Sequence, residues 1–200
     1  MMKPPLFGRG QRIGLFGGSF NPAHYGHYMV ALYALKRLRL DWVWWLVSPQ
    51  NPLKARDGMA PLAERVASAL DVKHHPRIEV SDAETRLGTR YTADTIGALR
   101  RRFPRIRFVW LMGADNLTQI ARWDRWTSIF HAVPVAVFAR PTYSLGAMAG
   151  KAATRFRNRQ LGSTIGPALP YAAPPAWAFF QIRLHAASAT AIRRAAVMGG

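Results

Sequence analysis

The sequence has no cysteine, so disulfide bridges, thiolate metal ligands and cysteine nucleophiles are all excluded. It also has few acidic residues, with 10 Asp and Glu against 28 Lys and Arg among 200 residues. The resulting formal charge of +18 favours polyanionic ligands such as nucleotides, nucleic acid or acidic lipid surfaces. The sign of the charge narrows the class of ligand and leaves the fold open. Most of the positive charge is arginine, which suits bidentate contacts with phosphate, although a genome-wide preference for arginine over lysine would give the same composition.

Long apolar runs are missing too. The basic start of the chain is followed by an apolar run that Gly17, Gly18 and Pro22 interrupt, so it lacks the core of about 7 to 15 residues that a signal peptide needs. The longest uncharged stretch, residues 160–182, contains four prolines and is not expected to span a membrane. We therefore expect a cytoplasmic protein without a membrane partner, and the lack of cysteine fits that location.

Half of the residues are apolar, so the chain can bury the core of one globular domain, expected at residues 12–197 after a tail at 1–11. Apolar runs predict strands at residues 12–16, 41–47, 77–80, 106–112, 133–138 and 178–182. Helical periodicity predicts helices at 25–40, 62–72, 92–103, 145–158 and 188–197, with an irregular segment at 161–175. This alternation indicates a Rossmann-like, doubly wound α/β fold, with helices on both faces of a mostly parallel sheet and ligands at the carboxyl ends of the strands.

The junction between the first strand and the first helix has the composition of an anion site. Residues 17–27 read GGSFNPAHYGH, in which glycines allow a phosphate close to the backbone and a helix N-terminus favours negative charge. His24 and His27, three residues apart, are expected to share one helical face and touch the same phosphates. A P-loop lysine and a G-x-G-x-x-G pattern are absent. A zinc site would need a third ligand that this segment does not supply, and the plain alternative is that the glycines only turn the chain and the histidines only pack.

From Gly18 to His27 the chain matches G-x-F-x-P-x-H-x-G-H and so resembles the nucleotidyltransferase superfamily of the H-x-G-H type. Further motifs follow in the order seen in bacterial nicotinate-nucleotide adenylyltransferases: SPQNPLK at 48–54, RYTADT at 90–95, LMGAD at 111–115, RW at 122–123, FARP at 138–141 and SATAIR at 188–193. The resemblance spans residues 12 to 195. Each motif alone also has a structural reading as a turn, a cap or core, but together they fall at predicted strand ends and helix starts.

The resemblance implies adenylyl transfer from ATP to the 5′-phosphate of nicotinate mononucleotide, giving nicotinate adenine dinucleotide and pyrophosphate in NAD biosynthesis. The acceptor phosphate would itself be the nucleophile. Because it is already anionic at neutral pH, the protein would mainly align two phosphates and offset their charge, without a general base. Mg²⁺ would be carried by the ATP phosphates and water, with no dedicated protein ligand.

The same resemblance assigns site residues. The catalytic contacts with the ATP phosphates would come from His24, His27 and Arg193. The other ATP-binding residues would be Gly17, Gly18, Ser19, Phe20, Gly113, Asp115, Ser188 and Thr190. The nicotinate mononucleotide would be bound by Asn51, Lys54, Thr92, Trp123 and Arg140. With Thr92 at a helix start, the pyridine carboxylate would be favoured over an uncharged amide.

Three features depart from the family pattern. Arg90 stands where relatives often carry serine, residues 186–190 read AASAT instead of the commoner ISST, and the chain ends soon after Arg194. Closure over the ATP site and contacts between subunits, including those of a homo-oligomer, are therefore left open.

Other functions remain as alternatives. The nearest is the same transfer to nicotinamide mononucleotide or phosphopantetheine, because the ATP motifs are shared across the superfamily. A basic module that binds RNA or DNA would use the net charge, the arginines at 100–102 and stacking by Trp110 or Trp126. A nucleotide sensor would bind ATP without releasing pyrophosphate.

Overall fold

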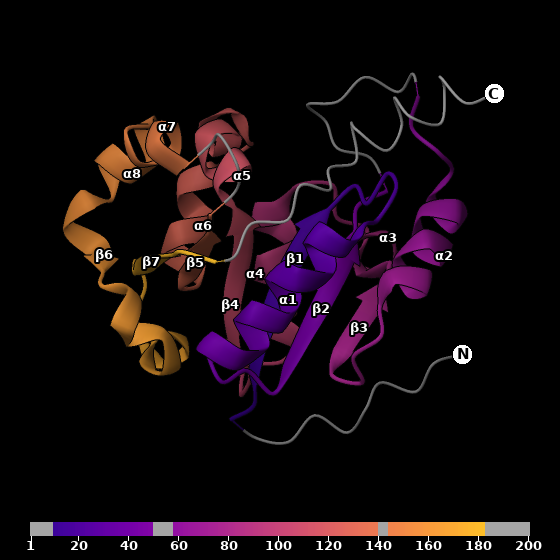
Figure 1. Cartoon of the computed structure of the whole chain (residues 1–200), viewed down its shortest axis with the longest axis horizontal. Helices are drawn as coiled ribbons and strands as arrows, with labels where there is room; N and C mark the ends of the chain where they lie inside the picture. Colours follow the sequence, from indigo (N-terminus) through magenta and orange to yellow (C-terminus); the bar gives the residue numbers. More distant parts are fainter. Residues whose placement is uncertain (1–9, 50–57, 140–143, 183–200) are drawn as a thin grey trace.

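The computed structural model describes residues 10–49, 58–139 and 144–182. Within these ranges the chain forms a seven-stranded sheet in the order β3-β2-β1-β4-β5-β7-β6, in which every pairing is parallel (Figure 1). The strands are β1 (Arg12–Gly18), β2 (Trp42–Val47), β3 (Ile78–Ser81), β4 (Arg107–Gly113), β5 (Val135–Phe138), β6 (Gln160–Leu161) and β7 (Trp177–Phe180). The sheet grows outward from β1 in both directions, which confirms the doubly wound α/β fold expected from the sequence.

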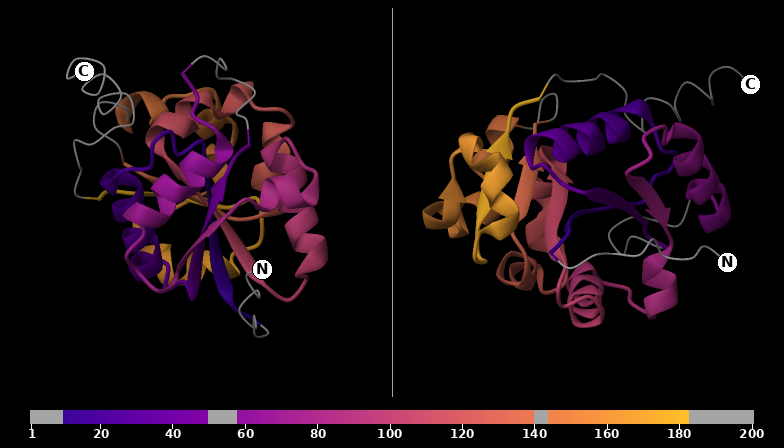
Figure 2. Two further views of the ribbon diagram at one scale, coloured as in Figure 1. Left: turned by 90° about the vertical axis from the view of Figure 1, so that its right-hand side faces the viewer. Right: turned by 90° about the horizontal axis from the view of Figure 1, so that it is seen from below.

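Helices cover both faces of the sheet, as the view from below shows (Figure 2, right). The first face packs against α1 (Tyr25–Arg37), α2 (Leu62–Val72) and the 3₁₀ helix η3 (Ser163–Tyr171). The second face packs against α3 (Ala83–Leu87), α4 (Thr92–Arg102), α5 (Ala114–Gln119), α6 (Trp126–Ala132), α7 (Ser144–Met148), α8 (Lys151–Arg155) and the 3₁₀ helix η1 (Ile120–Arg122). One further 3₁₀ turn, η2 (Arg157–Arg159), leads into β6.

The central strands are apolar on both sides because both sides are covered. On β1, Ile13 and Leu15 join the core of the second face while Phe16 joins that of the first. On β4 the same alternation sends Trp110 to the second face and Leu111 to the first. Continuous apolar runs are typical of parallel strands that are buried on both faces. The side chains alternate between the two faces in the structure, but the sequence does not show this alternation because both faces are apolar.

Most element boundaries differ from the predicted ones by one to three residues. The predicted helix at 145–158 is wrong as one element, since α7, α8 and η2 divide it and Gly150 separates the first two. The short helix α3 was not expected, because five residues are too few to show a helical period. The predicted helix at 188–197 lies outside the described residues.

The segment at 161–175, expected to be irregular, is instead largely helical. Residues 163–171 form η3, in which Gly166 and Leu169 are buried against the first face. Pro167 and Pro170 lie inside this 3₁₀ helix, although proline normally ends regular structure. Gly166 lies so close to the Arg37 carbonyl oxygen that any side chain would collide with it, so this turn is packed directly on the end of α1.

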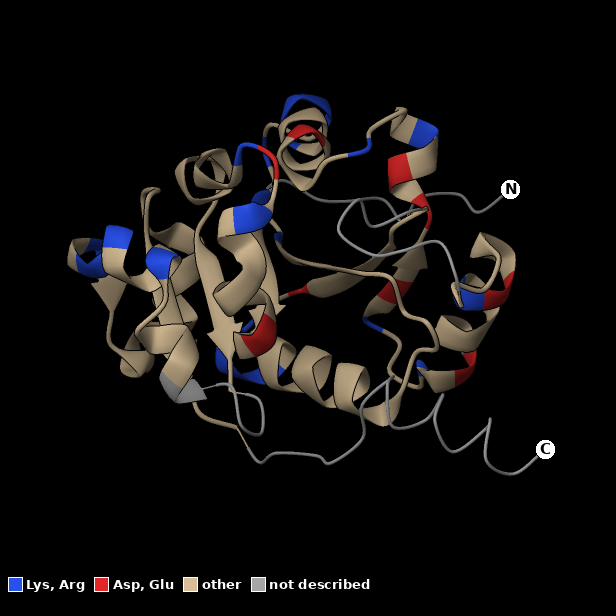
Figure 3. Ribbon diagram, turned by 90° about the horizontal axis from the view of Figure 1, so that it is seen from above, with Lys and Arg blue, Asp and Glu red and all other residues tan. Residues whose placement is uncertain are grey.

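All ten acidic residues of the chain fall between residues 41 and 124. The flank formed by α8, η2 and β6 consequently carries only cationic charge, as Figure 3 shows by its blue segments without red. Among the described residues no helix is both long and apolar enough to cross a bilayer. The boundaries of the predicted domain at 12–197 stay a prediction.

At the amino edge of the sheet, Arg12 and Asp41 join the starts of β1 and β2. The Arg12 guanidinium donates to both carboxylate oxygens of Asp41 at 2.7 and 3.0 Å, and the Arg12 backbone N–H donates at 2.7 Å. These hydrogen bonds, above all those from the guanidinium, hold the pKa of Asp41 below its ordinary value.

A carboxyl group with a lowered pKa in the folded state stabilises the fold at neutral pH and loses that contribution as acid protonates it. We therefore expect Asp41→Asn to destabilise the protein at neutral pH. The difference from wild type should shrink as the pH falls through and below the ordinary carboxyl pKa. Urea unfolding of both proteins at several pH values measures this, and a difference that stays constant into acid would contradict it.

Candidate active site

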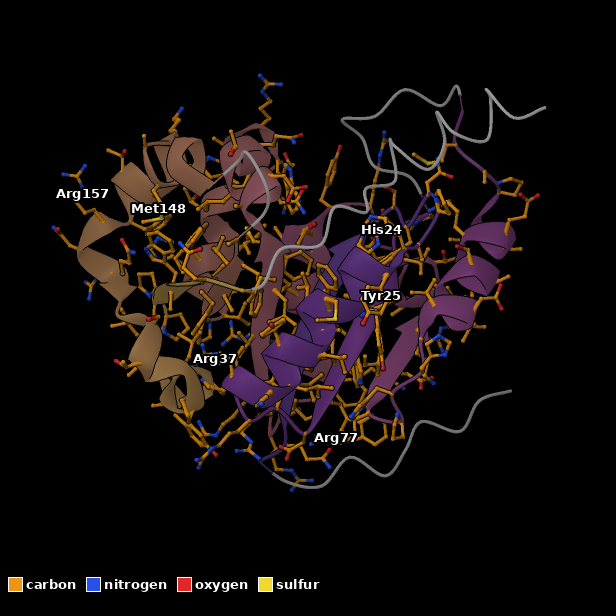
Figure 4. All side chains as sticks on the ribbon, viewed as in Figure 1. His24, Tyr25, Arg37, Arg77, Met148 and Arg157 are labelled. Atoms are coloured by element: carbon orange, nitrogen blue, oxygen red, sulfur yellow. The ribbon has the colours of Figure 1, made fainter. Side chains whose placement is uncertain are left out.

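The carboxyl ends of β1 and β4 form the point where the sheet reverses its winding. The chain leaves β1 for α1 on the first face and leaves β4 for α5 on the second. Gly17 and Gly18 end β1, and Gly113 ends β4 beside them. Figure 4 places His24 at this end of α1, with Arg37 at the opposite end. The predicted phosphate segment therefore lies at the edge where such folds bind ligands.

His24 and His27 form a reciprocal cap at the start of α1. His24 is the N-cap residue, and its Nδ1 accepts a hydrogen bond from the Gly26 backbone N–H at 3.1 Å. The Nδ1 of His27 accepts one from the His24 backbone N–H at 3.2 Å. This is the geometry of a capping box, with imidazoles in the places where serine and glutamate usually stand.

The cap determines where each imidazole carries its proton. Since both Nδ1 atoms accept hydrogen bonds, the neutral rings hold their protons on Nε2, and each Nε2–H is a hydrogen-bond donor. The ring centroids are 3.8 Å apart, and His24 is 4% exposed. The two imidazoles therefore lie side by side, as their spacing predicts, although His24 precedes the helix instead of belonging to it. Two N–H donors with a fixed tautomer are suited to phosphate oxygens.

Aromatic rings hold the loop before His24 from the side of the first face. Phe20 has φ of 45°, a left-handed conformation that a bulky residue adopts only when its surroundings impose it. Its ring is buried, stacks on Trp45 at 5.1 Å and meets Phe16 edge to face at 5.9 Å. His27 lies 4.9 Å from the same ring. The imidazole of His27 thus rests on an apolar cluster that fixes its position.

Gly17 is required for a reason that the sequence did not suggest. The edge of the Trp110 indole fills the space where a side chain at position 17 would begin. Trp110 also meets Trp123 edge to face, with ring centroids 6.4 Å apart. A continuous contact therefore runs from the end of β1 to Trp123, the residue expected against the pyridine ring.

The segment that carries Trp123 is fastened to the start of α4. Arg125, itself left-handed with φ of 46°, donates to Asp94 at 2.7 Å and to Asp124 at 2.6 Å. Asp94 lies in the first turn of α4, which begins at Thr92. The ion pair joins the segment of Trp123 to the first turn of α4, which begins at Thr92, the other residue that the resemblance assigned to the acceptor nucleotide.

The residues expected to bind ATP lie only in part within the described ranges. Gly113 is the N-cap of α5 and Asp115 lies in the first turn of that helix, next to the end of β1. Ser19 is 8% exposed and belongs to the loop after β1. Six predicted site residues lie outside the described residues: Asn51, Lys54, Arg140, Ser188, Thr190 and Arg193.

Arg65 is a residue of this site that the sequence reasoning missed. It lies on α2, is 2% exposed, and donates to the carbonyl oxygens of Ser19, Ser48, Pro49 and Ala60. Burial lowers the pKa of this guanidinium. The sequence feature that could have indicated it is the position of Arg65 on the apolar face of the predicted helix at 62–72. A charged side chain on that face is buried and needs hydrogen-bond partners in the interior.

Glu84, on α3, is the one buried acidic residue in the described part of the chain. It is 4% exposed, and burial raises the pKa of its carboxyl, an effect that a hydrogen bond with Ser48 opposes. Ser48 is therefore held on its carbonyl oxygen by Arg65 from the first face and on its side chain by Glu84 from the second. Within the described ranges no three His, Asp or Glu side chains cluster as metal ligands would.

Comparison with known proteins gives a consistent result. The sequence profile of the cytidylyltransferase-like family matches residues 15–195. A protein of Parvibaculum lavamentivorans, named a probable nicotinate-nucleotide adenylyltransferase, is 53% identical over 193 residues, which cover 96% of each chain. A protein of Cereibacter sphaeroides with the same name is 53% identical over 181 residues, 90% of this chain and 96% of its own.

Solved structures agree on the fold. The nicotinic acid mononucleotide adenylyltransferase of Plasmodium falciparum, in a complex with NaAD, superposes with a TM-score of 0.70 at 15% identity. The superposition covers 92% of this chain and 83% of that one.

The cap at α1 can be separated from the imidazole chemistry by substitution. We expect His24→Ala to lower the free energy of unfolding by about 1 kcal/mol, the usual loss for an N-cap side chain. His24→Asn should lose much less, because asparagine is among the best N-cap residues yet has no imidazole. Denaturant unfolding of the three proteins measures this. Equal stability of the alanine and asparagine variants would show that the observed cap contributes nothing.

Proposed function

The chain belongs to the cytidylyltransferase-like family and, within it, to the nicotinate-nucleotide adenylyltransferases, and we propose that it transfers the adenylyl group of ATP to nicotinate mononucleotide. The products are nicotinate adenine dinucleotide and pyrophosphate, so the reaction belongs to NAD biosynthesis. The observation that carries the proposal is the reciprocal cap of His24 and His27, which presents two Nε2–H donors beside the glycine-ended β1.

The triphosphate of ATP is the ligand that suits this arrangement. Its oxygens accept from the Nε2–H groups of His24 and His27, and the N-terminus of α1 favours their negative charge. The first turn of α1 carries no acidic side chain that would oppose this. From the other side we place Ser188, Thr190 and Arg193, and we place Gly113 and Asp115 against the ribose, as the family resemblance implies.

The reaction itself is a displacement at the α-phosphorus. An oxygen of the nicotinate mononucleotide phosphate forms the new P–O bond, and the bond from the α-phosphorus to the bridging oxygen of the β-phosphate breaks. Pyrophosphate leaves with the electron pair of that bond. The attacking oxygen is already ionised at neutral pH, so the protein contributes alignment and donors for the charge that develops on the leaving group.

The acceptor nucleotide is placed on the side of the second face. Trp123 would lie against its pyridine ring and the start of α4 at Thr92 beside its carboxylate, while Asn51, Lys54 and Arg140 would contact the rest. The ion pair of Arg125 with Asp94 supports this assignment, because it holds the segments of Trp123 and Thr92 together. An N-terminal helix end favours an acid over an amide.

Transfer from ATP generally uses a divalent cation, and we propose that Mg²⁺ enters as part of the substrate MgATP. Mg²⁺ keeps several of its waters and is commonly held by phosphates with one or two carboxylates. The donors observed at the end of β1 are N–H groups, which suit the phosphates and not the cation. A cytoplasmic location stays a prediction from the sequence, and the oligomeric state stays open.

The substrate assignment is tested by measuring pyrophosphate release from ATP with a panel of acceptors. Nicotinate mononucleotide is expected to give the highest kcat/KM, well above nicotinamide mononucleotide and phosphopantetheine. A preference for either of these would contradict the proposal. If no acceptor supports release although ATP binds, the protein is a nucleotide sensor, and binding of RNA that falls steeply with salt would favour the basic module.

The role of the imidazoles is tested by His27→Gln. Glutamine at this position can still complete the capping box, so the fold should be retained. It cannot supply the fixed imidazole donor, and we expect kcat/KM to fall by about 10²-fold or more. Steady-state kinetics measure the fall and circular dichroism monitors folding. Wild-type kinetics in this variant would remove His27 from the phosphate site.

A further inference from the structure

We propose that Arg65 is a positioning residue that holds the loop after β1 and the loop after β2 at a fixed separation and so aligns the two substrates. The inference rests on the proposed function, in which the first loop serves the ATP phosphates and the second serves the acceptor nucleotide. Arg65 touches neither substrate in this scheme. It acts through the backbone of the two loops.

The hydrogen bonds of Arg65 reach three separate segments. One terminal nitrogen, Nη1, donates to the carbonyl oxygens of Ser19 and Ser48, both at 2.7 Å. The other, Nη2, donates to the carbonyl oxygen of Pro49 at 2.9 Å, and Nε donates to that of Ala60 at 2.8 Å. Ser19 belongs to the loop after β1, Ser48 and Pro49 follow β2, and Ala60 precedes α2. A single side chain thus links the two strand ends through the start of a helix.

These acceptors are all backbone carbonyl oxygens. A buried guanidinium is costly unless dipoles or charges around it compensate, and here carbonyl dipoles do so. The compensation works only while the carbonyl groups point at the guanidinium. Burial of the charge therefore fixes the backbone of Ser19 relative to that of Ser48 and Pro49, because moving either would leave a buried donor unpaired.

Neighbouring side chains also tie the first loop to the α2 region. Asn21 bonds with Gly58 and Ala60, and Ser68 accepts from the Ala23 backbone N–H at 3.0 Å. Arg65 adds the link to Ser48 and Pro49. Its planar fork suits acceptors in several directions, whereas a lysine ammonium at the end of a flexible chain does not hold them in one plane.

The link that Arg65 makes between the two loops should affect turnover because of the geometry that the reaction requires. Displacement at phosphorus requires the attacking and leaving oxygens to lie in line, and a misplacement of about 1 Å can cost about 10²-fold in rate. The loop of Ser19 also leads directly to His24, the first residue of the reciprocal cap. A change in the separation of the loops should therefore act on the bound pair of substrates.

The test is Arg65→Lys, with Arg65→Gln as a second variant that removes the buried charge. Melting temperature, the fraction of active sites, kcat and the KM of each substrate are measured for both, at a temperature where the protein is folded. We expect kcat per active site to fall by about tenfold or more, a larger change than that in the KM for ATP.

Arg12→Lys is the matched control. Arg12 lies at the start of β1, at the amino edge of the sheet and away from the strand ends that Arg65 links, and its guanidinium holds Asp41. Its replacement should lower the melting temperature while kcat and both KM values stay at wild-type levels. A merely structural Arg65 would behave in the same way.

Wild-type kcat and KM in folded Arg65→Lys and Arg65→Gln would overturn the inference. Failure of both variants to fold would overturn it as well, since Arg65 would then serve stability and not positioning. The proposed function fails separately, when the wild-type protein itself releases no pyrophosphate from ATP with nicotinate mononucleotide.

Discussion

The candidate site depends on two hydrogen bonds at the start of α1, in which the Nδ1 of His24 accepts from the Gly26 backbone N–H and the Nδ1 of His27 accepts from the His24 backbone N–H. Those bonds begin α1, orient both rings and decide which nitrogen of each ring is a donor. The neighbouring features serve the same geometry. Phe20 and Trp45 support His27 from the first face, and Trp110 closes on Gly17 from the second. The start of α1 and the proposed phosphate contacts therefore depend on the same hydrogen bonds, and a substitution that disturbs the cap disturbs both.

The fold could be predicted from the sequence because its signals are local. Apolar runs that end in glycine or proline mark the strands, and the motifs fall where those runs end. The order of the strands follows from general rules for parallel sheets. Boundaries were less accurate, and α3 was missed because five residues show no period. The division of the segment at 145–158 depends on packing against the second face, which sequence does not display.

Part of the site could be predicted in the same way, since His24, His27 and Gly17 lie in one continuous segment. Arg65 could not, because its significance comes from carbonyl groups of residues 16 to 46 positions away in the chain. The same holds for Trp110, whose ring explains Gly17, and for Arg125, whose ion pair joins two motifs. Long-range backbone contacts leave almost no trace in a single sequence.

The uneven distribution of acidic residues also bears on the rate at which substrates associate with the protein. With no Asp or Glu after position 124, the flank at α8, η2 and β6 produces a positive potential that nothing on that flank offsets. Such a potential extends about one Debye length, ~8 to 10 Å, into physiological solution. Both proposed substrates are anions, so this potential would attract them, and the bimolecular rate constant, more than the bond-making step, would respond to ionic strength.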